Sequence, residues 1–174
     1  MQFLHFASLV FNIFVAEEIK DKYIIANCYT SIASIYLAQG NKKEALLNYQ
    51  KALKLGKEIN NISIISQSYQ NIGNIYINKK EYSEALNNYS ASLAIVKKSD
   101  NKQQLAMLYN NIGWIHQTQG NNADALKNYL ASLRLKEELG DKKGIINSGM
   151  NISDIYSQEK NGRRPFITPK KQLR

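Results

Sequence analysis

Apolar positions along most of this chain recur at the spacing of an α-helix. Tyr69, Ile72, Gly73 and Tyr76, for example, fall at positions i, i+3, i+4 and i+7, which places them on one helical face. The segment 85–93 has the same kind of spacing. No stretch of alternating apolar and polar residues is long enough to indicate a β-sheet, so the sequence predicts an all-α chain.

Two short blocks of residues recur every 40 residues. The first has an isoleucine followed three residues later by a second one, and it begins at Ile32, Ile72, Ile112 and Ile152. The second has an Ala-Leu pair, a tyrosine and a leucine, and it spans residues 45–53, 85–93 and 125–133. Each repeat therefore holds two amphipathic helices, and the repeats are expected to stack as helical hairpins.

Polar turns between these blocks predict where the helices begin and end. Gly40, Gly120 and Gly140 lie where a glycine can end a helix, and the segments 60–61, 99–101 and 140–141 can supply N-cap side chains. The sequence predicts helices near residues 3–18, 22–39, 42–57, 62–79, 82–98, 102–119, 122–139 and 143–159. We expect an α-α superhelix, a right-handed solenoid of antiparallel hairpins. Between its layers should lie Tyr36, Tyr49, Tyr76, Tyr89 and Tyr129.

The paired blocks resemble the tetratricopeptide repeat (TPR). The family pattern of apolar, small and aromatic positions is matched in the second repeat by Ile72, Gly73, Tyr76, Ala85, Tyr89 and Ser92. The third repeat matches too, except that His116 replaces the tyrosine. The longer period, against about 34 residues in most of the family, is similar to bacterial sensory and regulatory TPR arrays. A HEAT or armadillo array, with a period of about 40 to 47 residues, is the alternative.

The register divides the chain into three parts. Residues 1–26 form an apolar N-terminal capping helix and linker, residues 27–160 the TPR array, and residues 161–174 a basic tail that we expect to be disordered or loosely docked. Pro165 occupies the position that Ala125 has in the third repeat, so a second helix cannot form normally there. The sequence thus predicts about three complete hairpins with a half-repeat at each end.

The N-terminal helix is apolar nearly all round, whereas the terminal helix of an array should have one polar face. Three interpretations remain: a packed cap or self-association helix, a signal peptide or anchor, and the artefact of a truncated reading frame. No basic residue precedes the segment, and no small-x-small cleavage site follows it. Glu17 and Glu18 end it before the roughly 18 to 20 apolar residues of a membrane span. These features favour the cap.

The net charge of +9 lies largely outside the predicted array. Residues 161–174 carry five basic residues and no acid, which leaves +4 for the rest of the chain. Nucleic-acid binding by the array is therefore not favoured, and nucleic acid and membrane are not expected partners of the folded part. Cys28 is the single cysteine, which excludes an internal disulfide.

Residues that could carry catalysis fall at structural positions. His5 lies in the apolar N-terminal helix, His116 stands where Tyr36 and Tyr76 pack, and Cys28 has no histidine one turn away. The sequence contains no glycine-rich phosphate loop and no metal-binding motif. We therefore expect a cytoplasmic protein that is not an enzyme and that uses no cofactor or metal.

The TPR resemblance implies a concave groove lined by the first helix of each repeat. By register its positions are Asn27, Thr30, Ser31, Ser34, Gln67, Gln70, Asn71, Asn74, Met107, Asn110, Asn111, Trp114, Asn147, Met150, Asn151 and Asp154. A carboxamide can donate to a peptide carbonyl and accept from a peptide N–H, which suits an extended backbone. The predicted ligand-binding residues are Gln70, Asn71, Asn74, Asn110, Asn111, Asn151 and, as aromatic anchor, Trp114.

Simpler explanations of these residues remain open. Asparagine is frequent throughout the chain, as an AT-rich genome would produce, and Trp114 could fill space against Met107 or Met150. No groove position is basic, so a clamp for a terminal carboxylate is not expected.

The predicted function is a scaffold that binds a protein or an extended peptide, as the sensory or interaction part of a larger regulatory system. A second copy of the chain, bound through the N-terminal helix, is a further candidate partner. The alternative function is a regulator or assembly factor that contacts nucleic acid through the basic tail.

Overall fold

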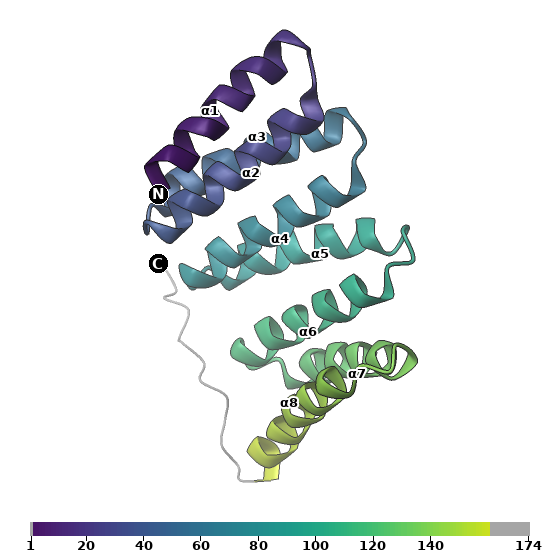
Figure 1. The fold of residues 1–174 in the computed structure, drawn as a ribbon. Coiled ribbons are helices and arrows are strands. Elements are labelled where there is room, and N and C mark those ends of the chain that lie inside the picture. Colours follow the sequence, from purple (N-terminus) through teal and green to yellow (C-terminus); the bar gives the residue numbers. More distant parts are fainter. Residues whose placement is uncertain (1, 161–174) are drawn as a thin grey trace, which may run out of the picture. The chain divides into compact units, whose positions relative to one another are not determined.

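The computed structural model describes residues 2–160 and contains eight α-helices in that range (Figure 1). They are α1 (Gln2–Glu18), α2 (Lys22–Ala38), α3 (Lys42–Glu58), α4 (Ile62–Asn78), α5 (Tyr82–Val96), α6 (Lys102–Thr118), α7 (Asn122–Glu138) and α8 (Lys142–Lys160). No β-strand occurs in this range. The predicted helices are confirmed, with every end within two residues of its expected position. The expected disorder of residues 161–174 concerns a segment outside the described residues.

A tight turn recurs every 20 residues along the chain. Its central residue has a positive φ at Lys20, Gly40, Asn60, Lys80, Asp100, Gly120 and Gly140. At Gly40 the N–H donates to the Leu37 carbonyl (3.0 Å), and the next N–H, of Asn41, donates to the Tyr36 carbonyl (2.9 Å). This pair of bonds is the Schellman motif, which satisfies carbonyls at a helix end. The same two bonds form at Lys20, Asn60, Lys80, Gly120 and Gly140.

The residue after each turn begins the next helix. Oδ1 of Asn41, Asn61, Asn101 and Asp141 accepts from the backbone N–H three residues later, at distances between 2.9 and 3.2 Å. These bonds satisfy donors that the start of a helix leaves unpaired. The prediction that the segments 60–61, 99–101 and 140–141 supply N-caps is confirmed, and the structure shows that the last residue of each segment is the one that caps.

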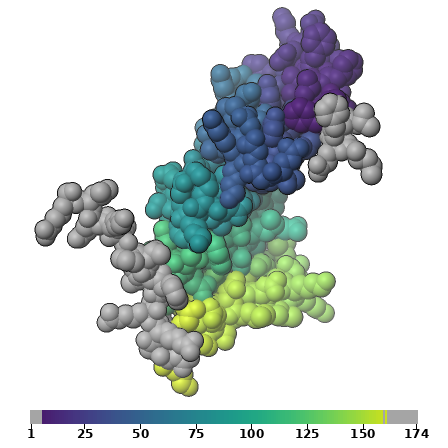
Figure 2. Space-filling model, turned by 90° about the vertical axis from the view of Figure 1, so that its left-hand side faces the viewer, coloured from purple at the N-terminus to yellow at the C-terminus, as the bar shows by residue number. Residues whose placement is uncertain are grey.

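The chain forms two compact units, residues 1–99 with α1 to α5 and residues 100–174 with α6 to α8. In the N-terminal unit each helix packs against the next in sequence, and in the C-terminal unit α6 packs on α7 and α7 on α8. Figure 2 shows this order within each unit, from purple to teal in the first and from green to yellow in the second. We call α2, α4, α6 and α8 first helices, and α1, α3, α5 and α7 second helices, after their register.

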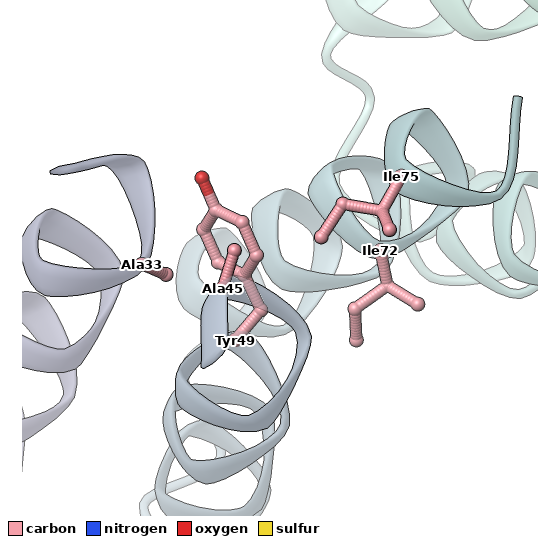
Figure 3. Packing of buried hydrophobic residues seen from close by; sticks show 5 residues of the cluster. All are labelled: Ala33, Ala45, Tyr49, Ile72 and Ile75. Atoms are coloured by element: carbon pink, nitrogen blue, oxygen red, sulfur yellow. The ribbon is translucent and has the colours of Figure 1, made fainter. Parts of the chain in front are cut away.

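A tyrosine from each complete hairpin fills the space between helical layers. In the N-terminal unit, Tyr49 of α3 is buried between Ala33 of α2 and the pair Ile72 and Ile75 of α4 (Figure 3). The predicted burial of this column is confirmed for Tyr49, Tyr89 and Tyr129, each at most 2% exposed. Tyr36 and Tyr76 pack, half-buried, against the same cluster as Tyr49.

The ring fits because the first helix carries a small residue beside it. A Cβ added at Gly73 would lie 2.9 Å from ring carbons of Tyr89, and one added at Gly113 would lie 2.8 Å from the ring of Tyr129. Carbon atoms do not pack at such distances, so glycine allows the two helices of the hairpin to approach closely.

α1 occupies the place of a second helix, as the register predicts. Leu9 stands where the other second helices carry the tyrosine, and it is buried with Cys28 and Ile32 of α2. Phe6 meets Tyr36 edge to face, with the ring centroids 5.7 Å apart. α1 is therefore packed onto α2 through one apolar face. No helix among the described residues is long and apolar enough to cross a membrane.

Glycine in place of Lys80 should stabilise the fold. Lys80 has a φ of +60°, a conformation that costs an L-residue about 1 kcal/mol and that glycine adopts freely. We expect Lys80→Gly to raise the free energy of unfolding by roughly 0.5 to 1 kcal/mol, measured by urea titration. The control Lys80→Ala removes the same side chain but keeps Cβ, so it should give no gain. An equal gain from both variants would show that the turn is not strained.

Candidate functional site

The predicted groove residues lie on first helices, where some of them also receive the hydroxyl of a buried tyrosine. In the N-terminal unit, Ser34 Oγ lies 3.0 Å from Tyr49 Oη, and Asn74 Oδ1 accepts from the Tyr89 hydroxyl at 2.5 Å. Ser34 and Asn74 occupy the same position in successive repeats, and both are exposed. In these two repeats a polar residue at this position of the first helix pairs with the hydroxyl of the core tyrosine.

Trp114 occupies this position in α6 and changes the pattern, because an indole ring offers no acceptor for the hydroxyl. The Tyr129 hydroxyl donates instead to Oε1 of Gln117, one turn further along α6, at 2.7 Å. The residues that match Gln117 in the first two repeats are Leu37 and Ile77, so in the third repeat the acceptor has moved by one turn. Trp114 itself is 41% exposed. The third repeat thus exposes the Trp114 ring, and the buried Tyr129 hydroxyl still has a hydrogen-bond partner.

Two side-chain hydrogen bonds join α6 to α8 within the C-terminal unit. Asn151 Nδ2 donates to Asn110 Oδ1 at 3.2 Å, and Gln117 Nε2 donates to Asp154 Oδ2 at 2.6 Å. The structure therefore brings Asn110 and Asn151 together, from two repeats. Sequence reasoning missed Gln117, whose signal is an amide at a position that is apolar in the first two repeats, at Leu37 and Ile77.

The other predicted amides differ in how they are used. Gln70 Nε2 donates to the Ser66 carbonyl and to Ser92 Oγ, both at 3.2 Å, so this group ties α4 to α5. Asn71 and Asn111 match each other in register and are half-buried, and their side chains have no hydrogen-bond partner among the described residues. Their amides are available to a ligand, whereas the donor of Gln70 is used inside the N-terminal unit.

The predicted groove positions carry little charge. None of them is basic, and Asp154 is the single acid among them. Burial raises the pKa of Tyr129 to about 12, and the negative charge of Asp154 adds to the shift. The tyrosine hydroxyl therefore stays protonated and donates to Gln117 at neutral pH.

The residues considered for catalysis lie apart from this face. Cys28 is buried, and burial raises the pKa of its thiol. His116 is half-buried, and its Nδ1 has no hydrogen-bond partner within the described range. In the residues that the structure describes, no group of three histidine, cysteine, aspartate or glutamate side chains could hold a metal ion. The side chain of His5 lies outside that description.

Replacing Gln117 by leucine, the residue of the first repeat, should destabilise the C-terminal unit. The change leaves the buried Tyr129 hydroxyl without its acceptor, which costs about 1 to 3 kcal/mol in the free energy of unfolding. Adding Trp114→Asn supplies an acceptor as Asn74 does for Tyr89, so the double variant should recover part of the loss. Urea titration of the two variants measures both effects. If the second change gives no recovery, the hydroxyl does not depend on an acceptor from α6.

Solved structures of similar fold come from several organisms. BtubC from P. vanneervenii is 19% identical with a TM-score of 0.77, over 88% of this chain and 64% of that chain. A signal transduction ATPase with numerous domains (STAND) from Pyrococcus horikoshii is 21% identical with a TM-score of 0.75, over 83% and 23%. Aspartyl phosphate phosphatase F from Bacillus subtilis is 16% identical with a TM-score of 0.73, over 90% and 47%. The chain spans less than two thirds of each, and at this identity the likeness shows the fold alone.

Sequence profiles identify the family. Two profiles described as Tetratricopeptide repeat match the chain, one over residues 25–63 and the other over residues 64–138. No curated protein sequence shows significant similarity to it. The matched residues include the small-residue and tyrosine positions that pack the hairpins together. The chain therefore belongs to the tetratricopeptide repeat family.

Proposed function

We propose that this chain is a binding module that holds an extended protein or peptide segment against its first helices, with Trp114 as the main apolar contact. The observation that carries the proposal is the exposure of Trp114 at a position that is polar in α2 and α4. The Tyr129 hydroxyl is paired with Gln117 instead, so it keeps an acceptor although Trp114 offers none. Exposed aromatic rings of this kind dominate the energetics of many interfaces.

Side chains near Trp114 suit a peptide backbone. Asn111 precedes Trp114 by one turn on α6, and its carboxamide can donate and accept at once. Asn110 and Asn151 use one donor and one acceptor on each other, which leaves Asn110 Nδ2 and Asn151 Oδ1 outside that bond. The C-terminal unit alone therefore combines a ring with several amides.

A binding module of this kind can be one part of a larger regulatory system. The STAND protein from Pyrococcus horikoshii is described as having a tetratricopeptide repeat sensor, and this chain covers 23% of that protein. We propose that this chain is likewise the sensory or interaction part of a larger regulatory system in the cytoplasm. It acts by holding a protein segment, without catalytic activity of its own.

Selection of peptides from a phage-displayed random library on the immobilised chain tests the proposal. Trp114 is the sole tryptophan, so its fluorescence reports the binding of tryptophan-free peptides to the wild type, and anisotropy of labelled peptides reports binding to the variants. We expect Trp114→Ala to weaken the selected peptides at least about tenfold, or about 1.4 kcal/mol. Asn111→Ala should weaken them less, since one hydrogen bond contributes about 0.5 to 1.5 kcal/mol.

Two variants on second helices serve as controls. Leu130→Ala removes an apolar side chain of α7 that is exposed about as much as Trp114, and Lys54→Ala removes a charge from α3. Neither change should alter the affinity, and far-ultraviolet circular dichroism should show every variant folded. If Leu130→Ala weakens binding while Trp114→Ala does not, the protein binds through its second helices and the proposal is wrong.

A further inference from the structure

The helices at the two ends of the described chain lack a hairpin partner there. By register α1 is a second helix and α8 a first helix, whereas α2 with α3, α4 with α5 and α6 with α7 form complete hairpins. Terminal helices of repeat arrays usually present a polar outer face. Here Phe11 and Phe14 are exposed on α1, and Met150 and Tyr156 are exposed on α8. Both ends therefore present apolar surface.

A first helix buries two positions, seven residues apart, inside its hairpin. In complete hairpins they are Ala26 with Ala33, Ser66 with Gly73, and Ala106 with Gly113, all buried. The matching residues of α8 are Ile146, which is 62% exposed, and Ser153, which is also exposed. α8 thus presents to solvent the positions that other first helices bury against a second helix.

A second helix buries one small residue against the first helix of its hairpin. It is Ala52 in α3, Ser92 in α5 and Ser132 in α7. Ser92 Oγ donates to the Ser66 carbonyl at 3.1 Å, and Ser132 Oγ donates to the Ala106 carbonyl at 2.7 Å. The matching residue of α1 is Asn12, which is exposed. Its amide can donate to the same kind of carbonyl, which in α8 belongs to Ile146.

The charged ends of the two helices match as well. Two complete hairpins have an ion pair between the first residue of the first helix and the last residue of the second, namely Lys22 with Glu58 (2.8 Å) and Lys102 with Glu138 (3.0 Å). The matching positions are occupied by Lys142, the first residue of α8, and by Glu18, the last residue of α1. Both are exposed, so the ends of α8 and α1 carry complementary charges.

The sizes of the side chains on α1 and α8 also match at the position where a complete hairpin packs its tyrosine. Complete hairpins pack a tyrosine against a glycine or alanine, as Tyr89 packs against Gly73. The matching residues are Leu9 in α1 and Ser153 in α8. A smaller side chain on the second helix therefore faces a larger one on the first, which conserves the packed volume.

We propose that α8 of one copy and α1 of a second copy pack together as a further hairpin, so that copies of this chain associate head to tail. Lys142 then pairs with Glu18, Asn12 donates to the Ile146 carbonyl, and Leu9 lies against Ser153. Because two different faces meet, the contact is heterologous, and each copy can bind another through its remaining face. This inference is independent of the ligand proposed for the first helices.

Sedimentation velocity of the full chain over a range of concentrations tests this association. Asn12→Glu and Ser153→Glu each place a carboxylate at the centre of the contact, and both positions are exposed in the single chain, so the fold is kept. We expect each change to weaken association at least about tenfold, because an unpaired charge would be buried. The matched controls Asn87→Glu and Ser90→Glu alter exposed positions of α5 and should leave association unchanged.

Mixing the two blocked variants distinguishes head-to-tail contact from other arrangements. The Asn12→Glu chain keeps an intact α8 face and the Ser153→Glu chain keeps an intact α1 face, so the mixture should form a one-to-one complex that grows no further. If Ser153→Glu has no effect while Asn12→Glu abolishes association, α1 pairs with α1 and the proposal is wrong. A wild-type chain that stays monomeric at about 100 µM overturns it too.

Charge exchange tests the register of the contact. Lys142→Glu and Glu18→Lys should each weaken association about two- to fivefold, as expected for an exposed ion pair turned into a repulsion. Both changes on one chain restore opposite charges at every contact, so the double variant should associate as the wild type does. Additive weakening in the double variant would contradict the register.

Discussion

The packing of a second-helix tyrosine against a small first-helix residue is the interaction on which the rest of this structure depends. The ring fills the space between layers, and the glycine or alanine beside it lets the helices approach. The buried hydroxyl must then find an acceptor, because an unpaired polar group in the core costs free energy. Asn74 and Gln117 supply that acceptor for Tyr89 and Tyr129, and Ser34 pairs with the Tyr49 hydroxyl. The need of the buried tyrosine hydroxyl for a hydrogen-bond partner thus determines some of the residues on the surface of the first helices.

This dependence separates two kinds of amide on the predicted groove. Asn74 accepts from a core tyrosine, and Gln70 ties α4 to α5, so both have a structural use. Asn71 and Asn111 have no such use among the described residues, although they share a register position. Trp114 stands where an acceptor is otherwise needed. Residues that the fold does not need are the better evidence for a ligand, and in the C-terminal unit Asn111 lies one turn before Trp114 on α6.

The even spacing of the turns explains how so few contacts build a regular array. A residue in the left-handed region lies every 20 residues between two helices, and at Asn41, Asn61 and Asn101 the side chain after it caps the next helix. Lysine, asparagine and aspartate occupy that region at Lys20, Asn60, Lys80 and Asp100, so the conformation follows from position rather than residue type. A turn that depends on position repeats the same hairpin along the chain, and the same faces recur on α1 and α8, where no other helix of the described residues covers them.

The sequence by itself determined the helices, their order, the buried tyrosines and the caps, because helical spacing, a 40-residue period and the chemistry of turn residues act over short distances. It also placed Asn110 and Asn151 on one face. It did not indicate that the Tyr129 hydroxyl would turn to Gln117, or that the donor of Gln70 would be used within its own unit. Those choices depend on which side chains of different helices meet within hydrogen-bonding distance, and only the tertiary structure decided them.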